Sequence, residues 1–226
     1  MQILFIGNSA TYVNDIPKML ERLANAAGYS LETDMVVKGG FRLSQHANGV
    51  CAREKIALDE IEKGYDIVFL QEVGNCFATE ENRQETAQAS EKLFDAIQKT
   101  GAKACYYVRP PYGRDLEGFT AAEQCRLLDD LFVGLSQRLG MECVFANRAF
   151  ADAIPKFGRR LWGDDNAHTS VLGAYLIVCS LFAALFGVSS KALALAAVEG
   201  IAPEEALLLQ EIADRISLEG YIPWKA

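Results

Sequence analysis

The sequence predicts an α/β fold in which a five-stranded parallel sheet is covered by helices on both faces. Short apolar runs alternate along the chain with longer stretches of helical periodicity, and this alternation is typical of parallel strands joined by helical crossovers. Half of the 226 residues are hydrophobic, which suffices for one packed domain with a sizeable core. We therefore expect a single domain over residues 1–226.

Five short runs are predicted as strands. The run 67–70 is continuous and apolar, as expected for a strand buried on both faces of a sheet, whereas charged residues alternate in the run 31–37. The predicted strands are residues 3–6, 31–37, 67–70, 104–108 and 142–145.

The first predicted helix covers about residues 16–27, because apolar residues recur there every three to four positions. Asn14 or Asp15 can cap this helix, Pro17 suits its first turn, and Gly28 ends it.

Further helices are predicted over about residues 80–100 and 120–139, each ended by a glycine. From about residue 188 the chain predicts a helical extension of the same domain, with its last helix starting at Pro203. We expect the closing segment, residues 221–224, to lie on the surface.

Residues 171–187 carry no charge, and 17 residues is about the lower limit for a membrane span. Acidic residues precede the segment directly, and basic residues are missing from its near flanks. A short apolar run more often marks a core element, so we predict a buried helix and no membrane partner.

The net charge of −8 disfavours nucleic acid as a partner, since binding it needs a basic surface. None of the six cysteines has C-x-x-C spacing, so neither a zinc knuckle nor a thioredoxin-type motif is indicated. The first residues lack the features of a signal peptide. These observations predict a reduced, cytoplasmic protein, and no motif calls for a metal or cofactor.

Gly7-Asn8-Ser9 directly follows the first strand, and the next helix is expected several residues later. Backbone N–H groups at such a position can stabilise an oxyanion or a phosphate. Ser9 is therefore a candidate nucleophile. An ordinary polar turn also explains all three residues.

Asp165-x-x-His168 precedes the apolar helix. In this spacing the carboxylate can bond Nδ1 of the imidazole and leave Nε2 as a general base. Asp164 competes with Asp165 as the orienting acid. Alternatively, Asp165 or Thr169 caps the helix and His168 is merely exposed.

Two further groups could donate hydrogen bonds to an oxyanion. Gly39-Gly40 follows the second strand, and Asn75 follows the third within Gln71-Glu72-Val73-Gly74-Asn75. A tight turn and an ordinary polar loop are the alternative interpretations.

Taken in order, these four blocks resemble those of the SGNH/GDSL hydrolases, a group of serine esterases and lipases. The resemblance spans about residues 3–187 and implies a flavodoxin-like three-layer α/β/α sandwich. It also implies an acyl-enzyme mechanism without a metal or cofactor, acting on a small-molecule ester. The first and last blocks match well, and the middle two are looser.

Carried over residue by residue, the resemblance makes Ser9 the nucleophile, His168 the base and Asp165 its partner. The N–H groups of Ser9 and Gly40 and the side chain of Asn75 would form the oxyanion hole. Gly39 is the fallback for Gly40.

The third block departs from the family's Gly-x-Asn-Asp and is closer to the Gln-Gly-Glu-Ser-Asn run of carbohydrate acetylesterases, which suggests an acylated sugar as substrate. Gln71 is the rival of Asn75 as donor. The first block departs as well, because Asn8 replaces the usual Asp.

Four residues are possible substrate contacts: Asn8, Gln71, His46 and Arg109. For His46 a partly buried structural role is the favoured interpretation, and Arg109 could instead pair with a carboxylate.

Two other functions stay open. The first is a non-catalytic or phosphate- and nucleotide-binding domain, although the glycine-rich pattern and lysine of phosphate loops are missing. The second is a metal hydrolase built on Asp164, Asp165, His168 and His46. An acyl-enzyme could also pass its acyl group to a sugar rather than to water.

Overall fold

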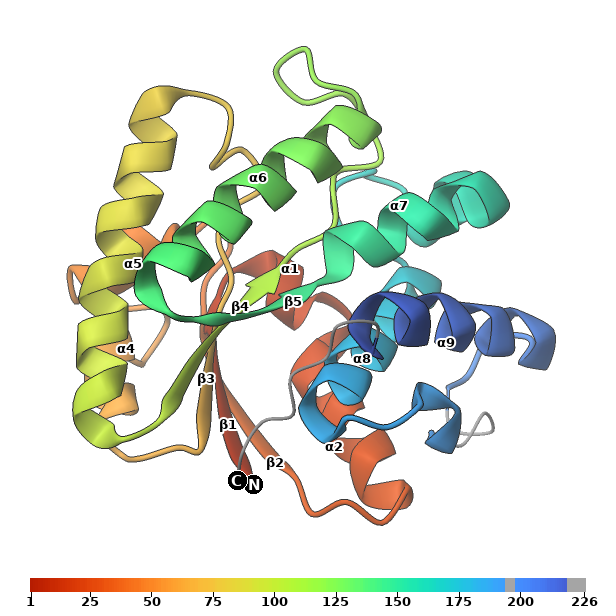
Figure 1. Cartoon of the computed structure of the whole chain (residues 1–226), viewed down its shortest axis with the longest axis horizontal. Coiled ribbons are helices and arrows are strands. Elements are labelled where there is room, and N and C mark those ends of the chain that lie inside the picture. The colour runs from red at the N-terminus through yellow and green to blue at the C-terminus, as the bar shows by residue number, and fades with distance from the viewer. Residues whose placement is uncertain (194–197, 219–226) are drawn as a thin grey trace.

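The computed structural model, which describes residues 1–193 and 198–218, contains a parallel five-stranded sheet (Figure 1). The strand order is β2-β1-β3-β4-β5, which is the order of flavodoxin-like folds. The strands are β1 (Gln2–Gly7), β2 (Glu32–Val37), β3 (Ile67–Leu70), β4 (Lys103–Val108) and β5 (Glu142–Phe145). The predicted fold class is confirmed.

Helices cover both faces of the sheet and create two separate cores (Figure 1). Side chains alternate along β1, so that Ile3 and Phe5 enter one core while Leu4 and Ile6 enter the other. The first core lies under α2 (Ile16–Ala26), α7 (Ala146–Phe157), α8 (Val171–Phe186) and α9 (Pro203–Leu218). The second lies under α3 (Leu43–Ala47), α4 (Ala57–Ile61), α5 (Glu80–Thr100) and α6 (Ala121–Leu139).

The apolar helix α8 is buried almost all round, as predicted for residues 171–187. It contacts α2, α7 and α9. These helices cover the side of α8 that would face solvent in an amphipathic surface helix. In the part of the chain that the structure describes, no helix combines the length and the apolar character needed to cross a membrane.

The start of the first helical region differs from the prediction. Helix α1 (Ser9–Tyr12) begins at Ser9 itself, not several residues later, and the 3₁₀ turn η1 (Val13–Asp15) connects it to α2. Asp15 stands at the N-cap of α2 without a side-chain capping bond. The predicted side-chain cap of α2 is therefore wrong. The side-chain amide of Asn14 instead donates to the carbonyl of Thr169, in a loop distant in sequence, at 2.7 Å.

Helix α7 was not predicted, although its sequence contains a signal. Ala146, Ala149, Phe150, Ala153 and Phe157 are buried at helical spacing. The helix follows β5 directly, so no loop residues separate the two elements. The closing segment 221–224, predicted on the surface, lies outside the described residues.

Candidate active site

Ser9 is held at the N-terminus of α1 by the residue before it. Asn8 is the N-cap of α1, and its Oδ1 accepts a hydrogen bond from Ala10 N at 3.0 Å. As the first residue of a helix, Ser9 has no intrahelical partner for its own N–H. Its side chain is half-buried, so a hydroxyl and an adjacent N–H lie together at the carboxyl end of β1.

The turn before Ser9 needs a glycine and the amide of Gln71. A Cβ on Gly7 would lie 2.6 Å from Oε1 of Gln71 and 2.8 Å from Oγ1 of Thr11. That Oε1 accepts from Asn8 N and from the Thr11 hydroxyl, both at 3.0 Å, while Nε2 donates to the Glu72 carbonyl. Gln71 is 1 % exposed, which argues against it as an oxyanion donor or substrate contact.

Both ends of the Asn8 side chain are used inside the protein. While Oδ1 caps α1, Nδ2 donates to the carbonyl of Phe41 at 3.0 Å. An aspartate could accept the capping bond but could not donate to Phe41. This explains the departure from the family's Asp, and it argues against Asn8 as a substrate contact because the residue is buried.

Gly40 stands in an exposed turn after β2. The N–H of Phe41 bonds back to the carbonyl of Lys38 at 3.1 Å, and Gly40 adopts φ of +70°, a conformation that favours glycine. Because Phe41 is also the partner of Asn8, the turn is joined to the Ser9 segment. A Cβ on Gly39 would lie 3.2 Å from the Tyr12 hydroxyl, so Gly39 faces α1.

The side-chain amide of Asn75 has a defined orientation. Nη2 of Arg42 lies 3.1 Å from Oδ1 of Asn75, and a guanidinium can only donate, so the atom that faces it must be the oxygen. Nδ2 therefore points to the other side, where it donates to Oε1 of the exposed Glu117 at 3.1 Å. Asn75 is half-buried, so its N–H group reaches a part of the surface where a ligand could bind.

Asp165 and His168 form a hydrogen-bonded pair. Oδ2 of Asp165 lies 2.6 Å from Nδ1 of His168, and Oδ1 accepts from the backbone N–H of His168 and of Ala167 at 3.0 and 2.9 Å. The two N–H bonds and the imidazole hold the pKa of Asp165 well below its usual range. Asp165, not Asp164, is therefore the partner, and it bonds the ring of the partly exposed His168 through Nδ1 and not through Nε2.

Two side chains hold the loop that carries this pair. Asn14 donates to the carbonyl of Thr169, directly after His168. Arg109 donates through Nη2 to the carbonyl of Ala167 at 3.2 Å, directly before it. These contacts tie the His168 loop to the Ser9 segment and to the loop after β4.

Arg109 has no free face for an acidic substrate. It is 5 % exposed, bonds the carbonyl of Pro110 and lies 4.1 Å from the ring centroid of Tyr112. The sequence suggested that Arg109 binds an acidic substrate or pairs with a carboxylate. The structure corrects both interpretations, because Arg109 bonds two backbone carbonyls and contacts an aromatic ring instead.

His46 is fully buried, in line with the structural role favoured for it. Its Nε2 lies 2.9 Å from the carbonyl of Gly7, beneath the Ser9 turn. Burial lowers the pKa of the imidazole, which favours the neutral ring. His46 therefore supports the backbone behind Ser9 and does not reach the surface to contact a substrate or to join His168 at a metal.

Sequence reasoning missed Arg42 and Asn14 as contributors to the site. The signal for Arg42 was its position two residues after Gly40, at the start of a short helix. For Asn14 no local signal existed, because its partner is 155 residues away along the chain.

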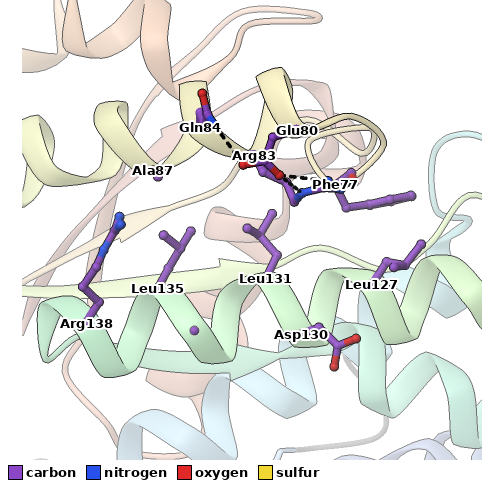
Figure 2. Close-up of a pocket in the computed structure, with 11 residues that line it drawn as sticks. Phe77, Glu80, Arg83, Gln84, Ala87, Leu127, Asp130, Leu131, Leu135 and Arg138 are labelled. Carbon is purple, nitrogen blue, oxygen red and sulfur yellow. Dashed lines mark hydrogen bonds and ion pairs between the residues drawn. The ribbon is translucent and has the colours of Figure 1, made fainter.

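A hollow of about 530 Å³ between α5 and α6 contains none of these residues (Figure 2). Leu127, Leu131 and Leu135 line it from α6, and on α5 Arg83 pairs with Glu80. Its other charged groups pair with residues outside the hollow, Asp130 with Arg126 and Arg138 with Glu91. We place the candidate site at the sheet edge instead.

Known proteins of similar structure share this fold. A candidate SGNH hydrolase from Slackia heliotrinireducens matches with a TM-score of 0.67 at 23% identity, covering 79% of this chain and 95% of its own. A DUF4886 family protein from Bacteroides uniformis gives a TM-score of 0.83 at 16% identity, covering 99% and 96%.

The acetylxylan esterase Axe2 from Geobacillus stearothermophilus gives a TM-score of 0.60 at 15% identity, covering 80% of this chain and 92% of its own. No family model and no curated protein sequence matches the chain. The chain therefore has an SGNH/GDSL-like hydrolase fold, shown by structure rather than by sequence identity.

Proposed function

We propose that this chain is a serine esterase that cleaves a carboxylic ester through an acyl-enzyme on Ser9. The observation that carries the proposal is the Asp165–His168 pair, whose loop is tied by Asn14 to the segment that begins with Ser9. The fold adds support, since structures of esterases share it. Ser9 at the start of α1 supports it as well, because a helix N-terminus offers backbone N–H groups to an oxyanion.

In this mechanism Nε2 of His168 takes the proton of the Ser9 hydroxyl as its oxygen attacks the ester carbonyl. Asp165 holds the imidazole in the right tautomer and stabilises the imidazolium that forms. When the tetrahedral intermediate collapses, His168 gives the proton to the leaving alcohol. His168 then activates a water molecule, which releases the acid and restores Ser9.

The oxyanion would bind to three donors: the N–H groups of Ser9 and Gly40 and Nδ2 of Asn75. These donors come from the loops after β1, β2 and β3. Strands β1 and β3 are neighbours at the point where the strand order reverses, and ligands bind at such points in open α/β sheets.

The alternative of a phosphate-binding domain has less support. Helix α1 has only four residues, and the capping oxygen of Asn8 already occupies the N–H of Ala10. That leaves few free N–H groups to surround a phosphate.

Hydrolysis of p-nitrophenyl acetate by the wild type, Ser9→Ala and Ser30→Ala tests the proposal. Ser30 is an exposed loop serine and serves as the matched control. We expect Ser9→Ala to lose activity by up to about 10⁶-fold, while Ser30→Ala keeps it. Full activity in Ser9→Ala would contradict the mechanism, and loss of wild-type activity with a chelator would favour the metal hydrolase.

A covalent probe separates the nucleophile from the rest of the site. The Ser9 oxygen should displace fluoride from a fluorophosphonate, which adds the mass of the phosphonyl group to Ser9, and His168→Ala should abolish the labelling because the hydroxyl loses its base. Labelling of another serine, or labelling of Ser9 that does not depend on His168, would count against the pair.

We further propose O-acetyl groups on a carbohydrate as the substrate, from the likeness to the acetylxylan esterase fold and the run that ends in Asn75. Release of acetate from acetylated xylo-oligosaccharides should exceed release from acylated lipids. Adding free xylo-oligosaccharide to the p-nitrophenyl acetate reaction shows whether the acyl group also passes to sugar.

A further inference from the structure

Glu72 is a buried carboxylate that the proposed mechanism does not use. It directly follows Gln71 at the end of β3 and is 2 % exposed. Its side chain therefore cannot contact a substrate from solvent. A buried acid is costly unless its oxygens are hydrogen-bonded, so its partners indicate what it does.

Two of those partners belong to the loops that carry the proposed oxyanion donors, and the third is the Thr86 hydroxyl of α5, which donates to Oε2 at 3.4 Å. Both carboxylate oxygens lie 3.2 Å from the N–H of Leu43, and Oε1 also accepts from Val73 N at 2.7 Å. Leu43 follows the Gly40 turn by three residues, and Val73 precedes Asn75 by two. One carboxylate thus joins the β2–α3 loop to the β3–α5 loop.

The bond to Leu43 satisfies a helix end that the local sequence leaves open. Leu43 is the first residue of α3, so its N–H has no partner within the helix. The N-cap residue Arg42 cannot help, because a guanidinium cannot accept a hydrogen bond, and Glu72 accepts from this N–H instead. Arg42 is left free to turn outward and fix the amide of Asn75.

We propose that Glu72 is a positioning residue, which holds the Gly40 turn and the Asn75 loop in the relation that an oxyanion hole needs. The inference rests on the proposed esterase function. Its anionic form is the active one, because a carboxylate can accept all of these bonds while a protonated carboxyl gives up acceptor capacity.

Burial raises the pKa of Glu72 to about 7, against the lowering effect of its backbone bonds and of Arg42. The other groups that face it are Glu85 on α5, Cys76 and Tyr106. Burial raises the pKa values of the Cys76 thiol and the Tyr106 phenol, so both stay neutral between pH 5.5 and 8.5. Glu72 therefore changes charge in the neutral range. His46 on α3 does not bond Glu72, because its Nε2 bonds the carbonyl of Gly7.

The kinetic test compares wild type with Glu72→Gln across pH. The glutamine resembles the protonated acid, so the wild-type to variant ratio of kcat should be about 10–100 at pH 8.5 and approach 1 at pH 5.5. Any ionisation that the two proteins share cancels in the ratio. KM should change little, since the donors act on the transition state.

Glu60→Gln is the matched control, because Glu60 is a buried glutamate (4 % exposed) that bonds Lys63 and Tyr65 away from the site. It should leave kcat unchanged at every pH. A ratio for Glu72→Gln that does not vary with pH would indicate a merely structural role and overturn the proposal.

A second measurement needs neither activity nor a stable Glu72 variant. In ¹H–¹⁵N NMR spectra of the wild type and of Ser9→Ala, the amide resonances of Leu43 and Val73 should shift together with a midpoint near pH 7. Amides that do not titrate overturn the proposal. Titrating amides in a protein without esterase activity would instead reject the esterase function and keep the Glu72 link.

Discussion

The two sides of the candidate site are built in different ways. On the base side, Asp165 and His168 lie three residues apart, and Asp165 is more than half exposed. The other side is the proposed oxyanion hole, which we call the acceptor side because it receives the oxyanion. Its residues Gly40 and Asn75 lie far apart in sequence. They are joined through the Glu72 carboxylate at the end of β3 and through Arg42.

The difference shows which chemistry a short motif can encode. A carboxylate can orient an imidazole within one loop, since local spacing sets the distance between the two groups. Donors from separate loops need a shared support, and we propose that the buried Glu72 carboxylate provides it. We therefore expect variants on the base side to act through the local pair and variants on the acceptor side to act over a longer range.

The largest effect that separates the two sides is expected for Asp165→Asn. An amide at this position favours the wrong tautomer of His168 and should lower kcat by about 10⁴-fold. Asp164→Asn is the matched control, because Asp164 is its exposed neighbour and should keep full activity. Steady-state kinetics with p-nitrophenyl acetate measures both, and equal losses in the two variants would contradict the assignment of Asp165.

A smaller loss is expected for Asn75→Ala on the acceptor side. Removing one oxyanion donor costs about 10²–10³-fold in kcat. Asn48→Ala serves as control, because Asn48 is exposed at the end of α3 and accepts only from a surface lysine, Lys92. Unchanged kcat in Asn75→Ala would remove this residue from the oxyanion hole.

The smallest effect concerns the link between Asn14 and Thr169. Asn14 adopts φ of +61°, so alanine loses the hydrogen bond and also strains the backbone, whereas glycine loses only the bond. We expect Asn14→Ala to lower the free energy of unfolding by about 2 kcal/mol and Asn14→Gly by about 1 kcal/mol. Urea denaturation measures both, and equal stability of the two variants would show that the backbone is not strained.

Glu72 also gives the wild type a pH-dependent stability. Because burial raises its folded pKa to about 7, above the usual 4.5 of a glutamate, the folded state binds the proton more tightly than the unfolded state between these values. The stability from this group is complete below about pH 4.5 and is lost as the pH rises through 7. Thermal melts of wild type minus Glu72→Gln should therefore show a difference that falls from pH 5 to pH 8.

The sequence by itself determined the five strands, the helices α2, α5, α6, α8 and α9, and the Asp165–His168 pair. Each depends on local periodicity or on a spacing of three residues, which the chain fixes before it folds. It also indicated Ser9, because a polar tripeptide at the end of a strand lies at the edge where such sheets bind ligands.

Only the tertiary structure decided what surrounds these residues. It assigned Gln71, His46 and Arg109 to internal support, since their partners come from elements that the fold alone brings near. It also showed why Asn8 replaces Asp. The carbonyl of Phe41 accepts a hydrogen bond that an amide can donate and a carboxylate cannot, and this partner cannot be read from the tripeptide. Ser9 and His168 lie 159 positions apart, and contacts such as Asn14 to Thr169 are long-range hydrogen bonds that no local pattern encodes.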